Sequence, residues 1–262
     1  MLECFVSICS RLNLRYYLVC GSALGAVKYG GFIPWDDDID VGMPREDYNR
    51  FLSMAPSLLP DHLFLQNYIS DPAFPHLYSK LRNSKTTYIE NNVSHLPIHH
   101  GVYIDIFPLD GYPIAHDDQK ALERVKADCQ KKLSCAFRLD RNLKAKIGCL
   151  LRRALCYHKR TKSVLERYTH VISQTPTSAA VIWCNHGNWQ GRLEYAPREQ
   201  YGQGTMMKFE GLDVCVPEQY DAYLTQKYGD WLRDIPLEQQ HGHHYYSVMD
   251  LEHSYTQYCN LD

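Results

Sequence analysis

Several features that would assign this 262-residue chain to a class of protein are missing from its sequence. The ten cysteines form no Cys-x-x-Cys pair, which disfavours a zinc ribbon or a thioredoxin-type motif. No window approaches 18 consecutive apolar residues, so no transmembrane helix is expected. Internal repeats and low-complexity segments are also missing. With 45% hydrophobic and 22% charged residues, the composition is that of an ordinary globular protein.

The start of the chain and its cysteines predict a cytoplasmic location. The first residues, MLECFVSICSRLN, lack a basic start and a long apolar run, so they do not resemble a signal peptide. Several cysteines lie in apolar stretches such as Leu18-Val19-Cys20, which suits buried, reduced thiols.

The net charge of −2 conceals an uneven distribution of charge. Residues 116–170 contain 15 Lys and Arg but 6 Asp and Glu, a balance of +9. Within them, the amphipathic segment 141–162 is either a surface helix packed on the domain or a peripheral contact with the inner face of an anionic membrane. No recognised nucleic-acid-binding module accompanies this charge, so no nucleic-acid partner is expected.

Apolar periodicity predicts an α/β (α+β) domain with a helical insertion. We expect a core in residues 1–115, a basic helical insertion in 116–170, and a C-terminal part in 171–262 that completes the core. Predicted strands lie at 15–20, 38–43, 63–67, 78–82, 86–89 and 102–107, a hairpin at 205–216, and helices at 2–12, 22–28 and 217–228.

Four carboxylates lie within five positions of the stretch GGFIPWDDDIDVGMP, residues 30–44. Like charges this close repel one another, so the stretch is either an acidic surface turn or a site for a cation. Side chains alternate along a strand, so Asp38 and Asp40 share a face, and Asp36 joins them if the extended chain reaches that far. Carboxylate oxygens suit Mg²⁺, or Mn²⁺ in its place, and Mg²⁺ keeps positions open for phosphate oxygens.

Two further motifs fit the same chemistry. Gly21-Ser22 follows a predicted strand and begins a predicted helix, with Ser22 as N-cap, so its N–H groups and hydroxyl could hold a phosphate. A serine N-cap alone is commonplace. Asp105 lies within the apolar stretch GVYIDIFPLDG, where an unpaired charge is costly. It is either a third carboxylate of the site, as metal ligand or general base, or a buried Asp satisfied by the backbone or an Arg.

A histidine group near the C-terminus is the remaining metal candidate. His241, His243 and His244 lie together, but no Cys or acidic residue accompanies them at ligand spacing. We therefore interpret this segment as a solvated tail.

Together these motifs resemble the LicD family, which includes bacterial phosphocholine transferases and the fukutin-related proteins. The resemblance is carried by GSALGAVKYGGFIPWDDDIDVGMPREDY, GVYIDIFPLDGYP and VPEQYDAYLTQKYGDW, which span residues 17–113 and 209–235. It implies a nucleotidyltransferase-like mixed sheet flanked by helices. On the family pattern Asp38 and Asp40 are metal ligands, Asp105 is the third carboxylate, and Gly21-Ser22 holds a phosphate.

Cationic residues are the remaining candidates for phosphate contacts. Lys28 stands where the family usually has Arg, and it keeps the positive charge. Ser22 stands where the family usually has Thr, and it keeps the hydroxyl. Lys80 and Arg82 share one face of a predicted strand, where they are either phosphate ligands or solvated charges.

The resemblance implies a metal-dependent transferase that uses a CDP-activated alcohol as donor. It would transfer a phospho-alcohol group to a sugar hydroxyl of a glycan or lipid-linked glycan and release CMP. Phosphocholine is the preferred candidate for this group, ahead of ribitol phosphate and glycerol phosphate. The acceptor would belong to lipopolysaccharide or teichoic acid, and residues 171–262 would complete the acceptor side of the domain. Two alternatives stay open: a nucleotidyltransferase that uses a nucleoside triphosphate, and a non-catalytic relative that binds a glycan or a partner protein.

Overall fold

The computed structural model describes residues 1–134, 136, 157–187, 194–242 and 244–258. Its α-helices are α1 (Leu2–Leu12), α2 (Cys20–Tyr29), α3 (Arg45–Met54), α4 (His116–Leu133), α6 (Tyr157–Ile172), α7 (Arg198–Tyr201) and α8 (Tyr220–Tyr228). Short 3₁₀ helices lie at Ala55–Ser57, Leu237–Gln239 and Tyr255–Gln257. The strands are β1 (Tyr17–Leu18), β2 (Asp40–Pro44), β3 (Leu63–Gln66), β4 (Ser79–Asn83), β5 (Thr87–Glu90), β6 (Tyr103–Gly111), β7 (Ile182–Asn185), β8 (Glu194–Pro197), β9 (Thr205–Phe209), β10 (Leu212–Val216) and β11 (Tyr246–Asp250).

Within the described residues, the strands form a seven-stranded mixed sheet and two smaller ladders. The order is β1-β2-β6-β4-β3, and β7 and β8 continue from β6. The central strand β6 runs parallel to β2, with Asp40 beside Asp105, and antiparallel to β4, with Lys80 on the other side of Asp105. Three segments that are distant in sequence therefore meet at Asp105. The ladders are the hairpin β9–β10 and the antiparallel pair β5–β11.

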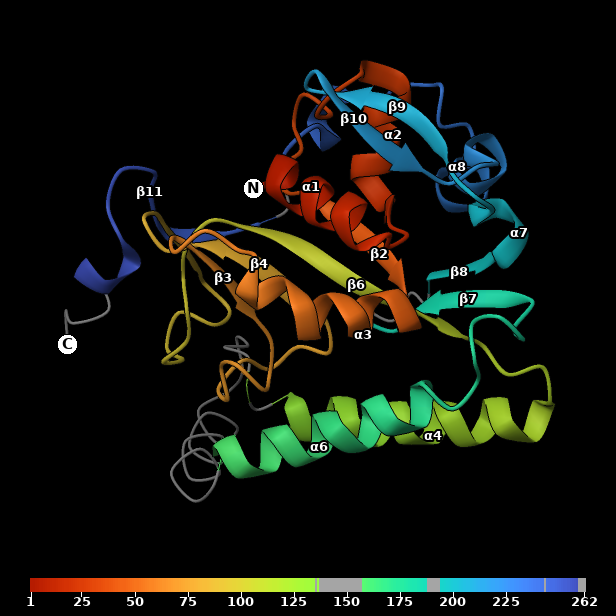
Figure 1. Cartoon of the computed structure of the whole chain (residues 1–262), viewed down its shortest axis with the longest axis horizontal. Coiled ribbons are helices and arrows are strands. Elements are labelled where there is room, and N and C mark those ends of the chain that lie inside the picture. The colour runs from red at the N-terminus through yellow and green to blue at the C-terminus, as the bar shows by residue number, and fades with distance from the viewer. Residues whose placement is uncertain (135, 137–156, 188–193, 243, 259–262) are drawn as a thin grey trace.

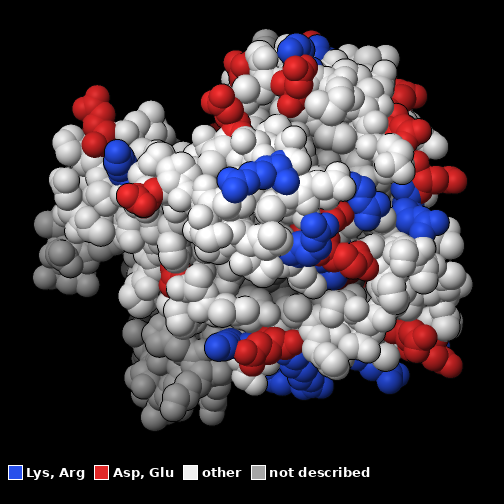
Figure 2. Space-filling model, viewed as in Figure 1, with Lys and Arg blue, Asp and Glu red and all other residues white. Residues whose placement is uncertain are grey.

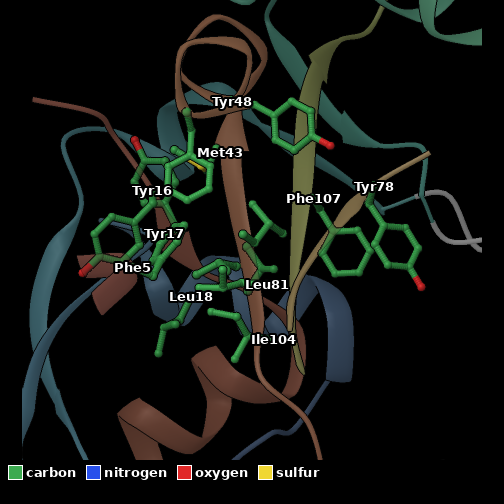
Figure 3. Close-up of a cluster of buried hydrophobic side chains, with 14 of the residues drawn as sticks. Phe5, Tyr16, Tyr17, Leu18, Met43, Tyr48, Tyr78, Leu81, Ile104 and Phe107 are labelled. Carbon is green, nitrogen blue, oxygen red and sulfur yellow. The ribbon is translucent and has the colours of Figure 1, made fainter. Parts of the chain in front are cut away.

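The main hydrophobic core forms because the central strands bury apolar side chains on the face opposite the acidic ones. Val41 and Met43 of β2 are fully buried, as are Leu81 of β4 and Ile104 and Ile106 of β6. Figure 3 shows several of these side chains packed against aromatic residues from other elements. This packing holds β2, β4 and β6 in register and thereby places the acidic residues that alternate with the core residues.

Helices α4 and α6 form a separate layer with their own apolar contacts. Leu122, Cys129 and Leu133 of α4 are buried against Leu165 and Tyr168 of α6. In the view of Figure 1 the sheet lies between this pair and the layer of α2, β9 and β10. The pair begins with the predicted insertion 116–170 and extends two residues beyond it, to Ile172; the limits of the insertion as a domain stay a prediction.

The outer surface of this helical pair carries charges of both signs. Asp128 pairs with Lys132 at 2.6 Å and with Arg167 at 3.7 Å, and Figure 2 shows basic and acidic side chains intermingled over these helices. Residues 137–156 lie outside the described residues, so most of the predicted membrane-contact segment 141–162 does as well. None of the helices in the described ranges is long and apolar enough to cross a membrane. The predicted cytoplasmic location stays a prediction.

His99 is a buried histidine near the end of strands β3 and β4. Its Nδ1 accepts a hydrogen bond from the Gly101 N–H at 3.1 Å, and its Nε2 lies 2.9 Å from Ser84 Oγ. This residue, His99, also stacks on Phe64 with ring centroids 5.2 Å apart. Because Nδ1 is an acceptor here, only the neutral ring satisfies both contacts. Burial, followed by the charge of Arg82, lowers the pKa of His99 from 6.5 to about 3.

The predicted mixed sheet flanked by helices is confirmed, with differences at element ends. The hairpin turn falls at Glu210 and Gly211, whose φ angles of 49° and 81° are both positive, as a tight hairpin requires. Helix α2 begins at Cys20, with Val19 as N-cap, so the prediction of Ser22 as N-cap is wrong. Ser22 lies instead within the first turn. Strands β7, β8 and β11 were not predicted, because their pairing depends on distant partners.

Candidate active site

A large cavity lies beside the first residues of β2 and the middle of β6. Its volume is about 1610 Å³, which exceeds the roughly 300–1,000 Å³ of a typical small-molecule site and leaves room for two substrates. Asp36, Asp38, Asp40 and Asp105 all line it, whereas Asp37 does not. The alternation expected for this stretch is therefore seen in the cavity, although regular strand pairing begins at Asp40.

Backbone pairing brings the three principal carboxylates to one place. Asp40 and Asp105 are register partners on parallel strands, and the Asp105 N–H donates to Ile39 O at 2.8 Å. Side chains of paired residues leave a sheet on the same face, so these two carboxylates are neighbours. Asp38 lies two residues earlier on the same side. The Asp40 N–H also donates to Ser22 Oγ at 2.8 Å, which ties the first turn of α2 to the start of β2.

Burial disfavours the charged form of these carboxylates. Burial raises the pKa of Asp38 to about 6, with Asp36 and Asp37 adding to the effect while His244 opposes it. Burial also raises the pKa of Asp105 to about 6, against the opposing charge of Lys80. A cation bound among these oxygens would relieve both the desolvation and the mutual repulsion. The donor set of hard carboxylate oxygens therefore fits a divalent cation such as Mg²⁺.

A buried ion network continues from Asp105 into β4 and β5. Lys80, which is 1% exposed and lines the cavity, has its Nζ 3.2 Å from Asp105 Oδ1 and 3.4 Å from Glu90 Oε2. Burial tends to raise the pKa of Glu90, but Lys80 and Arg82 outweigh it and lower that pKa to about 2. Glu90 was missed by the sequence analysis, because nothing within the segment TYIE indicates its ionic partners.

Arg82 does not lie in the cavity lining. Its guanidinium is fully buried and donates to Gln66 Oε1 and Gly101 O, each at 2.7 Å, and to Glu90 Oε2 at 3.3 Å. These contacts correct the prediction of Arg82 as a phosphate ligand, because its donors are engaged within the protein. Its position is that of a support for Glu90.

The predicted phosphate turn is partly occupied by an acidic side chain. A Cβ added to Gly21 would lie 2.4 Å from Asp36 Oδ2, so the Asp36 carboxylate lies against the first turn of α2. The positive end of a helix dipole favours such a carboxylate. Gly21 lines the cavity, whereas Ser22 is buried and uses its hydroxyl oxygen to hold Asp40.

Lys28 joins α2 to the C-terminal part of the chain. Its Nζ lies 2.7 Å from Asp234 Oδ1 and 3.3 Å from Trp231 O. The Tyr29 hydroxyl donates to the same Asp234 oxygen at 3.1 Å. Lys28 and Asp234 both line the cavity, so this predicted phosphate contact lies at the site but already has an acidic partner.

Residues 229–242 and 244–250, which we call the C-terminal strap, complete one wall of the cavity. The strap ends in β11, which pairs with β5. His244 within it places Nδ1 2.8 Å from Asp37 Oδ1 and Nε2 3.6 Å from Asp38 Oδ2. In the described ranges, Asp37, Asp38 and His244 are the group of potential ligands whose atoms all lie within 4.8 Å of one another.

The interpretation of this histidine segment as a solvated tail is wrong for His244. Burial tends to lower the pKa of His244, but the carboxylates of Asp38 and Asp37 outweigh burial and raise it. His241 is exposed and does not line the cavity, and His243 lies outside the described residues. The sequence carries no local signal for the contact, because His244 and Asp37 are 207 positions apart.

Comparison with known proteins gives the class of domain to which this mixed sheet, with acidic residues on two adjoining parallel strands, is similar. The family model for the LicD/FKTN/FKRP nucleotidyltransferase domain matches residues 13–132. The lipopolysaccharide cholinephosphotransferase LicD of Haemophilus influenzae is 29% identical over 259 residues, which cover 93% of this chain and 92% of that protein. Residues 13–132 are therefore similar to the LicD family, and most of the chain is similar to one LicD protein.

A shorter similarity links the chain to animal proteins. The human and mouse proteins named ribitol 5-phosphate transferase FKRP are each 45% identical to it over 42 residues. That segment is 16% of this chain and 8% of either relative.

Proposed function

We propose that this protein is a metal-dependent transferase that moves phosphocholine from CDP-choline to a sugar hydroxyl of a cell-surface glycan and releases CMP. The observation that carries the proposal is the meeting of Asp38, Asp40 and Asp105 at one large cavity. The alignment with a lipopolysaccharide cholinephosphotransferase along nearly the whole chain supports the choice of phosphocholine and of a lipopolysaccharide-type acceptor.

Asp38, Asp40 and Asp105 are the residues that would hold Mg²⁺ or Mn²⁺. Their oxygens are hard ligands, and burial makes the charge of Asp38 and Asp105 costly without a cation. When bound, the metal would neutralise charge on the diphosphate and on the departing CMP. Lys80 contributes a cation to this group, at 3.2 Å from Asp105.

The transfer exchanges one phosphorus–oxygen bond for another. The acceptor hydroxyl oxygen bonds to the phosphorus of phosphocholine, while the bond from that phosphorus to the bridging oxygen of the diphosphate breaks. CMP leaves with the bonding electron pair. The acceptor proton passes to a carboxylate, and Asp105 is placed for this role when Asp38 and Asp40 hold the metal, because it is the register partner of Asp40 on the adjoining strand. Asp105→Asn distinguishes a metal ligand from a general base. If Asp105 is a ligand, the variant should lose metal binding; if it is the general base, the variant should still bind the metal but lose turnover.

Aromatic residues in the cavity support choline, an alcohol that carries a quaternary ammonium group, as the transferred alcohol. Tyr29 and Trp35 both line the cavity, with ring centroids 6.5 Å apart and planes at 76°. Asp234, whose Oδ1 accepts from the Tyr29 hydroxyl, is already paired with Lys28, so its charge is balanced within the protein. Aromatic faces are suited to choline, whereas ribitol or glycerol would require a denser set of hydrogen-bonding groups.

The test is calorimetric titration with CDP-choline, CDP-ribitol and CDP-glycerol, with and without Mg²⁺. We expect Mg²⁺-dependent binding of CDP-choline that Asp38→Asn abolishes. Asp213→Asn is the matched control, because Asp213 is exposed and pairs with Lys208 on the β9–β10 hairpin. Binding of none of the three donors by the folded protein would overturn the proposal.

A nucleotidyltransferase that uses a nucleoside triphosphate is the second candidate, because the matching family model is described as a nucleotidyltransferase domain. Phosphorus NMR of the reaction products separates the two: CMP supports the transferase, and pyrophosphate supports the nucleotidyltransferase.

A further inference from the structure

Away from its central carboxylates, the cavity is lined by two groups of residues with different chemistry, which come from different elements. One part, between α2 and the C-terminal strap, is lined by the charged residues Lys28, Asp230, Arg233 and Asp234; we call it the charged arm. The other, which we call the neutral arm, lies between β6, β7 and the end of α4 and includes Tyr78, Phe107, Gln130, Ser134 and Asn185. Among the described residues that line the neutral arm beyond Lys80 and Glu90, there is no Asp, Glu, Lys or Arg.

Aromatic rings form one wall of the neutral arm. The rings of Tyr78 and Phe107 have centroids 4.6 Å apart, and a third ring, that of His76, lies 4.7 Å from Tyr78. Figure 3 shows Tyr78 and Phe107 side by side at one end of the buried cluster, with the Tyr78 hydroxyl directed away from the other labelled side chains. His76 adds no charge, because burial lowers its pKa to about 3.

The rings of Tyr78 and Phe107 lie against the backbone of Gly187, just after the end of β7. A Cβ added to Gly187 would lie 2.8 Å from Phe107 Cδ1 and 3.0 Å from Tyr78 Cδ1, so a larger residue would press on both rings. The Gly187 N–H donates to Asn185 Oδ1 at 2.8 Å. This bond orients the Asn185 amide and engages its oxygen, which leaves its NH₂ group as the donor that can face a ligand.

The neutral arm begins where the reaction would take place. Lys80 Nζ lies 3.2 Å from Asp105 Oδ1 and 5.8 Å from the Tyr78 ring centroid. A ligand resting on Tyr78 would thus have one end beside Asp105. Because Tyr78 and Phe107 are 9% and 8% exposed, they would offer ring edges beside amides and a hydroxyl, which suit a neutral sugar and offer nothing to a diphosphate.

We propose that the neutral arm is the acceptor site, which binds a neutral sugar through the rings of Tyr78 and Phe107, while the donor nucleotide lies in the charged arm. This inference rests on the proposed transferase function, and it assigns which wall of the cavity holds which substrate. Gln130, from the last turns of α4, supplies a hydrogen-bonding group at the edge of the neutral arm. The helical insertion therefore contributes directly to acceptor binding.

The experiment measures donor and sugar binding separately in the full-length protein. Saturation-transfer NMR with methyl glycosides of glucose, galactose and N-acetylglucosamine reports sugar binding, and calorimetry with CDP-choline and Mg²⁺ reports donor binding. Gln130→Ala should weaken sugar binding about threefold to tenfold, as the loss of one hydrogen bond does, without changing donor affinity. Gln239→Ala is the matched control, because it removes the same amide from the opposite wall and should leave sugar binding at the wild-type level.

A second variant guards against an uninformative result. Phe107→Leu keeps an apolar side chain but removes the ring, so it should weaken the saturation transfer to the sugars while the protein still binds CDP-choline. The proposal is overturned if no glycoside binds a protein that binds CDP-choline, or if Gln239→Ala weakens sugar binding as much as Gln130→Ala. Failure of CDP-choline to bind, with sugar binding still sensitive to Phe107→Leu, would reject the proposed transferase function but retain the sugar site.

Discussion

Replacing Lys80 with methionine tests the electrostatic balance of the cavity. Methionine keeps an unbranched apolar chain and removes the ammonium that lies 3.2 Å from Asp105 and 3.4 Å from Glu90. Two unit charges at 3.2 Å attract by about 5 kcal/mol at an effective dielectric constant near 20. Removal of one partner from a buried pair costs about 3–5 kcal/mol. We therefore expect Lys80→Met to lower the free energy of unfolding by about 3–5 kcal/mol near pH 7.

The loss should depend on pH, because the buried partner can be neutralised. Without Lys80, the pKa of Asp105 rises further above its present value of about 6. Below that pKa the carboxyl is protonated and no longer needs a counter-charge, so the difference between variant and wild type should shrink as the pH is lowered toward 5. Glu90 keeps its contact with Arg82 at 3.3 Å throughout.

Urea unfolding at several pH values is the assay. Lys132→Met is the matched control, because Lys132 also pairs with an aspartate, at 2.6 Å, but both side chains are at least 40% exposed. An exposed helix pair of this kind contributes only about 0.3–0.5 kcal/mol. A loss for Lys80→Met that is no larger than the control, or that is the same at all pH values, would refute the reasoning.

Three further predictions follow from particular contacts. Asp40→Asn removes a carboxylate from the proposed metal site at the start of β2, so it should abolish the increase in melting temperature that Mg²⁺ causes in differential scanning fluorimetry. The exposed control variant Asp213→Asn should respond to Mg²⁺ like wild type. Gly21→Ala should weaken Mg²⁺-dependent CDP-choline binding in calorimetry, because its Cβ would displace the carboxylate of Asp36, and unchanged affinity would contradict this. For His99 the folded pKa of about 3 lies below the unfolded value of 6.5, so the unfolded chain binds the proton first and stability falls as the pH drops below 6.5, by about 1.4 kcal/mol per pH unit. Urea unfolding of His99→Gln should show a shallower decline with acid, and a decline of equal slope would contradict the assignment.

Local patterns in the sequence were sufficient where short-range physics decides the structure. The period-two alternation of DDDIDV predicts that Asp36, Asp38 and Asp40 share a side, and all three line the cavity. The apolar flanks of Asp105 predict a buried strand, and β6 is such a strand. The hairpin at Glu210 could also be predicted, because its turn geometry depends on neighbouring residues.

The positions of cationic side chains could not be predicted in the same way. Lys80 and Arg82 lie two residues apart on β4 and have the same pattern in sequence. Lys80 lines the cavity, while Arg82 lies outside its lining with donors engaged by Gln66, Gly101 and Glu90. Which of the two faces a substrate depends on partners contributed by other strands, and a single segment carries no information about them.

Residue type and spacing along one segment were sufficient for the acidic stretch, for the alternation that directs its side chains and for the similarity to the LicD family, because none of these depends on a distant part of the chain. Tertiary structure alone decided that His244, 207 positions from Asp37, lies against it, and that residues of α4 and β7 form a neutral arm beside Asp105. The physical reason is that pairing and burial act between segments of the chain: the charge, the pKa and the accessibility of a side chain are set by the neighbours that folding brings to it.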